Sequence, residues 1–429
     1  MKSNSSSDRL FPLLLDMLFR TDTDNPGISP PIICKMEEMF TMFVLDPIIE
    51  QHLSEDNIIE AVNRLKFQPE DLVNALDRLV RISTPTDIDH VEEALQQVGH
   101  EASMITLFKV YTQFLHRDNS EDRRLYVPRG SKIIPKHKPG ADVIKGALYQ
   151  TLLRKAAERR DIGNIYIHPE VHGMVVSLEQ YIANRPIQTI GRGSSLCLPD
   201  DMQNFRYFVQ WSSKYDPEEL QLSGVLISED WTDSKYIWFG NLHGANSIGY
   251  HDGYTLDSTS SYGASEFIDI NMDAVVRSGY RYVLMSVYNF SYMKYKELPE
   301  AFVGWMLRKQ VDSSADYDPR MVIHKFDITT DYARAYPVLF DVIDRKAYWL
   351  DLGSSALEAD VLNIVRDTAF ITKIQTLMKG HQPNLRTLIE IHARVRGGIV
   401  YYPEDADVIV SLTGDITPSQ IDKIIEEFL

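Results

Sequence analysis

One stretch, residues 205–308, limits what this chain can fold into more than any other. It is a series of short aromatic and β-branched runs separated by clusters of Gly, Asp, Asn and Ser, which is the pattern of antiparallel strands joined by loops. In the first run Phe205, Tyr207 and Val209 fall on one face and Arg206 on the other, the period of two that a half-buried strand requires. We therefore predict a two-sheet β-sandwich.

The length of the chain, 429 residues, exceeds the size at which one hydrophobic core stops growing, so two or three domains are expected. No apolar run approaches the roughly 18 residues that cross a bilayer. The run FPLLLDML near the start lacks the basic flank and cleavage site of a signal peptide. We therefore expect a cytoplasmic protein without a membrane span.

The two cysteines also fit a cytoplasmic protein. Cys34 and Cys197 lie far apart in dissimilar segments, so they make neither a disulfide framework nor a thiolate metal cluster. We expect both to be reduced thiols in the core, with no disulfide between them.

Charge and periodicity divide the chain further. Residues 1–120 carry 10 basic and 20 acidic side chains and residues 121–195 carry 13 and 7, within a net charge of −17. Apolar residues recur at helical spacing in the first part, and strands alternate with helices in the last. The prediction is an α+β protein with an acidic helical domain (1–120), a basic connecting segment (121–200), the sandwich (201–352) and a small α/β unit (353–429).

The helical domain contains residues that are typical of helix starts and ends. Ser54 is predicted to be the N-cap of the helix that contains IIEAVNRL, and Pro69 to open the next helix. A third helix is expected between Pro85 and Gly99. The apolar stripes of these helices indicate core packing rather than a cofactor site.

The connecting segment contains a near-repeat, LYVPRGSKIIP and QTIGRGSSLCLP. Each run is interpreted as a strand entered through a tight turn at Gly130 or Gly193. A phosphate cradle is the alternative, although neither run is a Walker loop.

A helix with a basic face is expected between these two runs. We expect this face to be solvated. The basic segment 121–195 as a whole could meet an anionic partner such as RNA or a nucleotide, or it could lie against acidic neighbours in the same chain. The overall acidity favours the second interpretation and makes nucleic-acid binding unlikely by charge. The residues of the face are Arg154, Lys155, Arg159 and Arg160.

Two further clusters have both a functional and a structural interpretation. His168 and His172 have the spacing of zinc ligands on a helix, but Pro169 disfavours a helix there and structural histidines are favoured. In the C-terminal unit, the side chains around a double glycine could grip an anion, but a solvated helix end with Arg near the negative dipole is favoured. These side chains are His392, Arg394 and Arg396.

Within the sandwich, the runs ELQLSGVLI, FGNL, YHDG, GASEFIDI and VYNF resemble the TerD family of tellurite-resistance and stress-response proteins. TerD domains are β-sandwiches that hold calcium between acidic loops, through D-L-D, H-S-G-D and G-D-D-E motifs. The resemblance therefore implies a calcium-site region in this chain. It also implies that His251 is a loop residue near that region.

The calcium motifs are degenerate in this sequence. The first has become Glu219-Leu220-Gln221, and the third ends in Ala264-Ser265-Glu266. Calcium takes six to eight oxygen ligands and its affinity follows the number of ligand charges, so binding is predicted to be weak or absent. The remaining candidate ligands are Glu219, Asp252, Asp257 and Glu266, with Asp269 next along the strand. The other interpretation is that these are solvated loop residues.

No enzyme motif appears in the sandwich region. It has no G-x-S-x-G elbow and no G-x-G-x-x-G after a strand, and the adjacency of His251 and Asp252 is no evidence for a catalytic triad. The predicted function is a non-catalytic cytoplasmic scaffold or sensor of the TerD type, with protein partners. The alternatives are a metal-dependent hydrolase with its site between domains and a nucleotide- or RNA-binding adapter.

Overall fold

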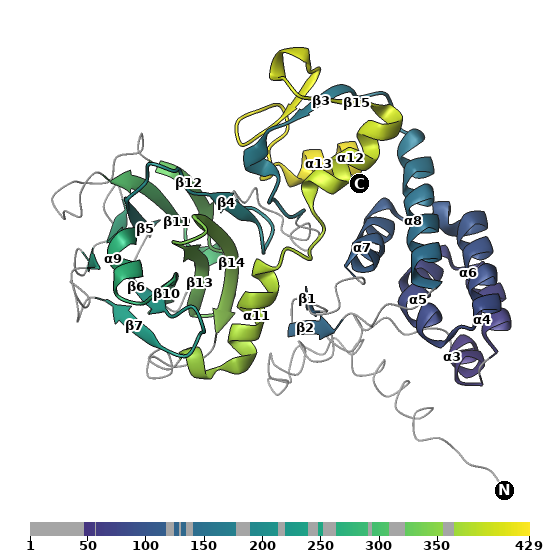
Figure 1. The fold of residues 1–429 in the computed structure, drawn as a ribbon, viewed down its shortest axis with the longest axis horizontal. Coiled ribbons are helices and arrows are strands. Elements are labelled where there is room, and N and C mark those ends of the chain that lie inside the picture. Colours follow the sequence, from purple (N-terminus) through teal and green to yellow (C-terminus); the bar gives the residue numbers. More distant parts are fainter. Residues whose placement is uncertain are drawn as a thin grey trace, which may run out of the picture.

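The chain is an α+β protein, as predicted, with helices on one side, two facing antiparallel sheets on the other and a small parallel sheet between them (Figure 1). None of the helices in the described ranges is both long enough and apolar enough to cross a bilayer. The computed structural model describes residues 47–55, 57–116, 124–127, 130–133, 140–176, 189–212, 219–238, 248–251, 263–290, 294–308, 322–354 and 364–429.

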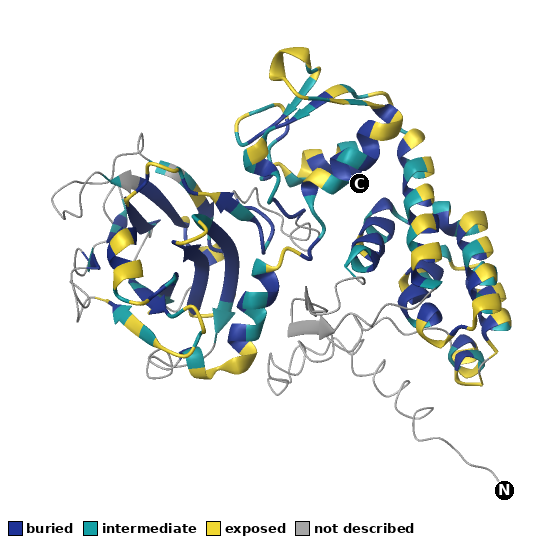
Figure 2. Ribbon diagram, in the orientation of Figure 1, coloured by how far each residue is buried: buried dark blue, intermediate teal, exposed yellow. Residues whose placement is uncertain are grey.

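The N-terminal helices bury one apolar stripe each (Figure 2). They are α3 (Pro47–Ser54), α4 (Ile58–Leu65), α5 (Pro69–Ile82), α6 (Pro85–Val98) and α7 (Met104–Leu115). Pro69 and Pro85 stand in the first turns, as predicted. The prediction for Ser54 is wrong: it is the last residue of α3, and Asn57 caps α4 by accepting from the backbone N of Glu60.

Helix α8 (Gly140–Ala157) packs against α6, α7 and α12 (Leu385–Arg396). The basic residues at its end and just after it, expected to form a solvated face, also contact the chain itself. Arg154 donates to Gln96 O at 2.9 Å, Lys155 to His100 O at 2.9 Å and Arg159 to Glu426 O at 2.6 Å, and Arg160 pairs with Glu427.

Two antiparallel sheets form the predicted sandwich. The six-stranded sheet has the order β4-β14-β13-β10-β6-β7, and the five-stranded sheet has the order β12-β11-β5-β9-β8. The strands are β4 (Ser195–Cys197), β5 (Asn204–Ser212), β6 (Leu220–Ile227), β7 (Ser234–Ile237), β8 (Gly249–His251), β9 (Ala264–Asn271), β10 (Tyr282–Asn289), β11 (Glu300–Arg308), β12 (Val322–Asp327), β13 (Arg334–Asp341) and β14 (Lys346–Ser354).

Aromatic side chains fill the space between the sheets. The ring of Phe340 on β13 lies 4.4 Å from that of Phe205 on β5 and 5.3 Å from that of Trp305 on β11. Trp211, Trp305 and Trp349 are all buried there. Burial of such large side chains is the main source of stability for a sheet-on-sheet core.

Strand β5 differs from the prediction of a half-buried strand, because both of its faces are covered. Phe208, on the opposite face from Tyr207, is buried with Phe267 and Phe302. Arg206 is buried on that same face. Strand β9 ends at Asn271, which caps the helix α9 (Met272–Arg277) by accepting from Ala274 N.

The six-stranded sheet is covered on its outer face by α11 (Thr368–Met378). Phe370, Ile374 and Leu377 of this helix belong to one hydrophobic cluster with Tyr336 and Leu339 of β13. The outer face of this sheet is therefore apolar under α11.

The third sheet combines residues that lie far apart in the chain. Its order is β15-β3-β16, and both pairings are parallel. Strand β3 (Gly163–Ile167), from the predicted connecting segment, lies between β15 (Gly397–Val400) and β16 (Val408–Val410). The predicted C-terminal helices are present as α12 and α13 (Ile421–Phe428).

The two Arg-Gly-Ser runs each lead into a strand, as predicted. Gly130 opens β2 (Gly130–Ile133), which pairs with β1 (Arg124–Val127). Gly193 has a φ of +87° and precedes β4. Cys197 at the end of β4 is exposed, so its prediction as a core thiol is wrong, and Cys34 lies outside the described residues.

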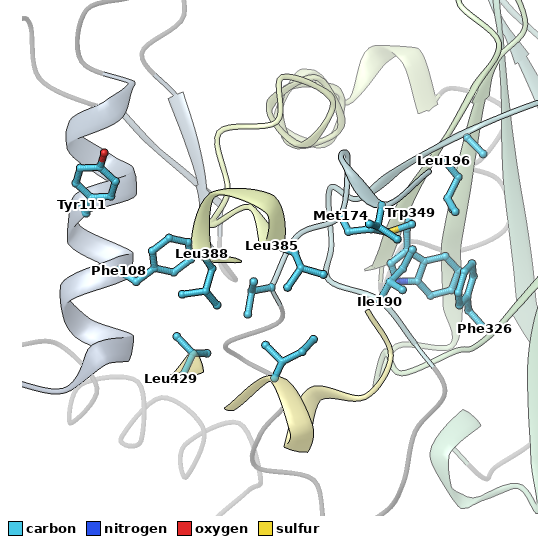
Figure 3. Packing of buried hydrophobic residues seen from close by; sticks show 14 of the residues in the cluster. Phe108, Tyr111, Met174, Ile190, Leu196, Phe326, Trp349, Leu385, Leu388 and Leu429 are labelled. Atoms are coloured by element: carbon cyan, nitrogen blue, oxygen red, sulfur yellow. The ribbon is translucent and has the colours of Figure 1, made fainter. Parts of the chain in front are cut away.

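One hydrophobic cluster extends from the N-terminal helices to the sandwich (Figure 3). Phe108 of α7 and Leu388 of α12 lie on one side of it, and Met174, Ile190 and Trp349 lie on the other. The apolar contacts between the units are therefore continuous.

Candidate functional site

The first half of strand β6 is the place where two residues of the predicted site region meet. Strand β7 pairs with β6 only from Gly224 to Ile227, so the backbone of Leu222 lies beyond that pairing. The N–H of Leu222 donates to Glu266 Oε2 at 2.7 Å, and its carbonyl lies 2.9 Å from His251 Nε2. Glu266 and His251 are thus partners of backbone groups that β7 does not reach.

His251 is a strand residue, which corrects the expectation that it lies in a loop. It ends β8 and is fully buried, and its Nε2 is 3.8 Å from Glu266 Oε2. Burial lowers the pKa of His251 below its ordinary value, although the bond to the Leu222 carbonyl acts in the opposite direction. Because a carbonyl only accepts, Nε2 carries the proton and is a donor here.

The other predicted ligands have separate positions. Glu219 stands just before β6, and its carboxylate accepts from Gln221 Nε2 at 2.9 Å. Asp269 is held by Arg206, with Nε–Oδ1 at 2.7 Å and Nη2–Oδ2 at 2.8 Å. The remaining two candidates, Asp252 and Asp257, lie outside the described residues.

These contacts make a poor fit to calcium. A calcium ion takes six to eight oxygen ligands, whereas one oxygen of Glu266 bonds the backbone and both oxygens of Asp269 bond a guanidinium. Over the ranges that the structure describes, no group of three or more His, Cys, Asp or Glu side chains could hold a metal ion. The described carboxylates therefore act first as structural hydrogen-bond partners.

A second buried carboxylate, Asp351, was not suggested by the sequence. It lies in a bulge of β14 with a φ of +42°, opposite Pro337, which has no N–H to donate to the neighbouring strand. Thr329 donates to it from its backbone N, at 3.2 Å, and from its hydroxyl. Arg192 Nη2 lies 3.4 Å from its carboxylate. Arg192, which lies in the second Arg-Gly-Ser run, therefore faces a carboxylate of the same chain.

The electrostatics of Asp351 follow from its position. Burial raises the pKa of its carboxyl, although Arg192 and Thr329 act to lower it. The second Arg-Gly-Ser run, which contains Arg192, is the sequence feature that pointed to this contact. Nothing in the sequence around Asp351 indicates a bulge.

The histidine pair in HPEVH is divided between different partners. A short 3₁₀ helix, Pro169–Val171, separates the two residues, so the predicted absence of a continuous α-helix is confirmed. His168 Nδ1 is 3.3 Å from Glu170 Oε1, and His172 Nδ1 is 3.4 Å from Arg386 Nη1. Burial and then the Arg386 charge lower the pKa of His172. A cation at this distance disfavours a metal ligand.

The cluster at the end of α12 is also internal. Arg396 is buried and donates to Arg160 O and Glu427 O, each at 2.7 Å. Its Nη1 lies 2.8 Å from His392 Nδ1. The prediction of a solvated helix end is therefore wrong for Arg396, which holds the backbone at the end of α13, while Arg394 lies 6.0 Å over the ring of Tyr149.

The comparisons with known proteins give partial similarities to solved structures, among them the following two. No protein-family model matches the sequence, and no curated protein matches it. A protein of unknown function, SAV2460, is 11% identical, covers 36% of this chain and 93% of its own, and has a TM-score of 0.27. SCO6318 from Streptomyces coelicolor A3(2), a homologue of the telluride resistance protein TerD, is 9% identical and has a TM-score of 0.30. The match covers 38% of this chain and 95% of SCO6318. Neither similarity assigns a family or a function to this chain.

Proposed function

We propose that this protein is a non-catalytic scaffold or sensor of the TerD type, acting in the cytoplasm in a stress response through protein partners. The proposal rests on the motifs YHDG and GASE. The observation that carries it is the contact of His251 and Glu266, one from each motif, with Leu222. Since β6 belongs to one sheet and β8 and β9 to the other, these side chains join the two sheets.

Such a contact favours a structural use of the motif residues over a catalytic one. A general base needs a nitrogen or carboxylate oxygen within reach of a substrate proton. His251 instead uses Nε2 to donate to a backbone carbonyl, and it is fully buried. The α-helical units that share a core with the sandwich would present surfaces to partners.

Calcium binding at this region is proposed to be weak or absent, with any dissociation constant on the order of 10⁻⁴ to 10⁻³ M. Titration calorimetry on chelator-stripped protein measures it, with Glu266→Gln as the test variant and the exposed Glu404→Gln as the matched control. A dissociation constant at or below about 10⁻⁶ M that only Glu266→Gln weakens would place the site among calcium sensors.

The scaffold role is tested in the organism that carries the gene. The full chain is isolated under tellurite stress and without it, and the bound proteins are compared by mass spectrometry with those on a tagged control protein. We expect stress-dependent partners, and loss of tolerance on deletion that both wild type and Glu266→Gln restore. Isolation of the protein alone, together with unchanged tolerance after deletion, would overturn the proposal.

A further inference from the structure

Arg334, the first residue of β13, is a buried arginine on the outer face of the six-stranded sheet. Only 3% of it is exposed. Its Nη1 lies 3.2 Å from Ser286 Oγ, and its guanidinium carbon lies 4.4 Å from the centre of the Tyr288 ring. Its Nε is buried and has no hydrogen-bond acceptor among the described residues.

The other two buried arginines of the described residues have carboxylate partners. Arg206 binds Asp269 through Nε and Nη2, and Arg396 Nη2 lies 3.7 Å from Glu427 Oε2. No carboxylate of the described ranges forms an ion pair with Arg334. A buried cation without an anion is strongly disfavoured, so this position calls for a counter-charge.

Glu219, just before β6, does not supply it. In register, Arg334 pairs with Tyr288 of β10, and Tyr288 pairs with Gln221 of β6, which bonds Glu219. Two strand spacings separate β13 from β6, about 10 Å. Glu219 bonds Gln221 instead, and within the described residues no ion pair joins it to Arg334.

The neighbours of Arg334 carry donors suited to an oxyanion. Ser286 accepts from Arg334 Nη1, so its own hydroxyl proton is directed elsewhere and can be donated. Ser223 lies opposite Ser286 in register on β6 and is partly exposed, as is Tyr288. The charge of Arg334 also acts to lower the pKa of the Tyr336 phenol, which burial raises to about 12, as expected for a cation close to that ring.

We propose that Arg334 and Ser286 form a binding site for a small oxyanion, the phosphate or carboxylate group of a ligand. The Nε edge of the guanidinium would hold the anion as Arg206 holds Asp269, since guanidinium matches planar and tetrahedral oxyanions. The guanidinium lies over the ring of Tyr288, at a distance that permits a cation–π interaction. This site is separate from the Glu266 region, and it does not depend on the scaffold role.

The test uses the full chain in a chloride buffer at constant ionic strength. Unfolding temperature is followed by tryptophan fluorescence while inorganic phosphate or acetate replaces chloride, and the affinity is measured by calorimetry. The two anions distinguish the phosphate source from the carboxylate source. We expect one of them to raise the unfolding temperature of the wild type by about 3 °C at ten times its dissociation constant.

Three variants make the result specific. Arg334→Gln should bind the anion at least about tenfold more weakly and should equal or exceed the wild type in stability without the anion, since it removes a buried charge. Ser286→Ala should show an intermediate loss of affinity. Arg386→Gln, which breaks an exposed pair with Glu390, should behave as the wild type.

A purely structural role for Arg334 predicts the reverse. Arg334→Gln would then be less stable at every anion concentration, and neither anion would shift the wild type beyond chloride. That result, or an equal anion response in Arg334→Gln, would overturn the proposal. If Arg334→Gln fails to fold, an anion response that is the same in Ser286→Ala and the wild type overturns it too.

Discussion

Replacement of Asp269 by Asn tests how far the sandwich depends on one buried ion pair. Arg206 and Asp269 are each 1% exposed and are joined by two hydrogen bonds of 2.7 and 2.8 Å. The variant keeps the shape of the side chain but removes the charge of the carboxylate that binds a buried guanidinium, and it can turn an amide toward N–H donors. Breaking a buried pair in this way costs about 3–5 kcal/mol of unfolding free energy.

Tryptophan fluorescence in urea is the appropriate assay. All 5 tryptophans of the chain lie in the sandwich, between residues 211 and 349, so the signal reports on this unit and not on the helices. With a urea dependence of about 2 kcal/mol per M, the expected loss moves the midpoint down by about 1.5–2.5 M. A shift of this size is far outside the error of the measurement.

Two controls separate the charge from the packing. Asp331→Asn removes an exposed carboxylate that lies 2.7 Å from Lys296 Nζ, and it should cost no more than about 0.5 kcal/mol. The double variant Arg206→Met with Asp269→Leu should regain much of the lost stability, because apolar side chains often replace a buried pair without loss. A cost below about 1 kcal/mol for Asp269→Asn would refute the reasoning.

Two pH-dependent predictions follow from other buried groups. Burial lowers the pKa of His324 from 6.5 to about 4, so wild-type stability should fall between these values as pH falls, by about 1.4 kcal/mol per pH unit from this group. His324→Phe should show a smaller slope in the same assay, and an unchanged slope would contradict the cause. Burial raises the pKa of Asp351 in the folded protein above its ordinary value. The stability that this carboxyl contributes below its ordinary pKa is therefore lost as pH rises through the folded pKa. The unfolding free energy of Asp351→Asn should therefore increase relative to that of the wild type as pH rises. Asp351→Val should lose about 1–3 kcal/mol of unfolding free energy, because a β-branched residue is strained at a φ of +42°. Equal stability of the two variants would contradict this.

Local patterns were sufficient to predict the class of fold. Alternation in runs such as 205–211 identified strands, and Gly, Asn and Asp clusters separated them, so the antiparallel sandwich was predictable. Helix starts were less certain. Ser54 and Asn57 are both good N-caps, and the choice depends on where α3 ends, which the sequence between them does not reveal.

Long-range pairing explains what the sequence did not show. Arg206 has the place of a solvated residue in an alternating strand, but its partner Asp269 comes from β9, and the face that both occupy is buried. Similarly, Glu266 was found through its motif, whereas its shared contact with His251 depends on the meeting of two sheets at Leu222. Neither pairing is visible at local spacing, because each joins separate strands.

Hydrogen bonds through residues 174–194 join the sandwich to the C-terminal unit. Ser194 accepts from Trp349 N of β14 at 2.8 Å through its carbonyl and from Val175 N at 2.9 Å through its hydroxyl. Met174 O, next to Val175, accepts from Leu385 N at the start of α12, at 2.9 Å. Because these bonds connect β14 and α12 through adjacent residues, a change in the Arg-Gly-Ser turn should disturb both units together. Units held in this way keep a fixed relative geometry.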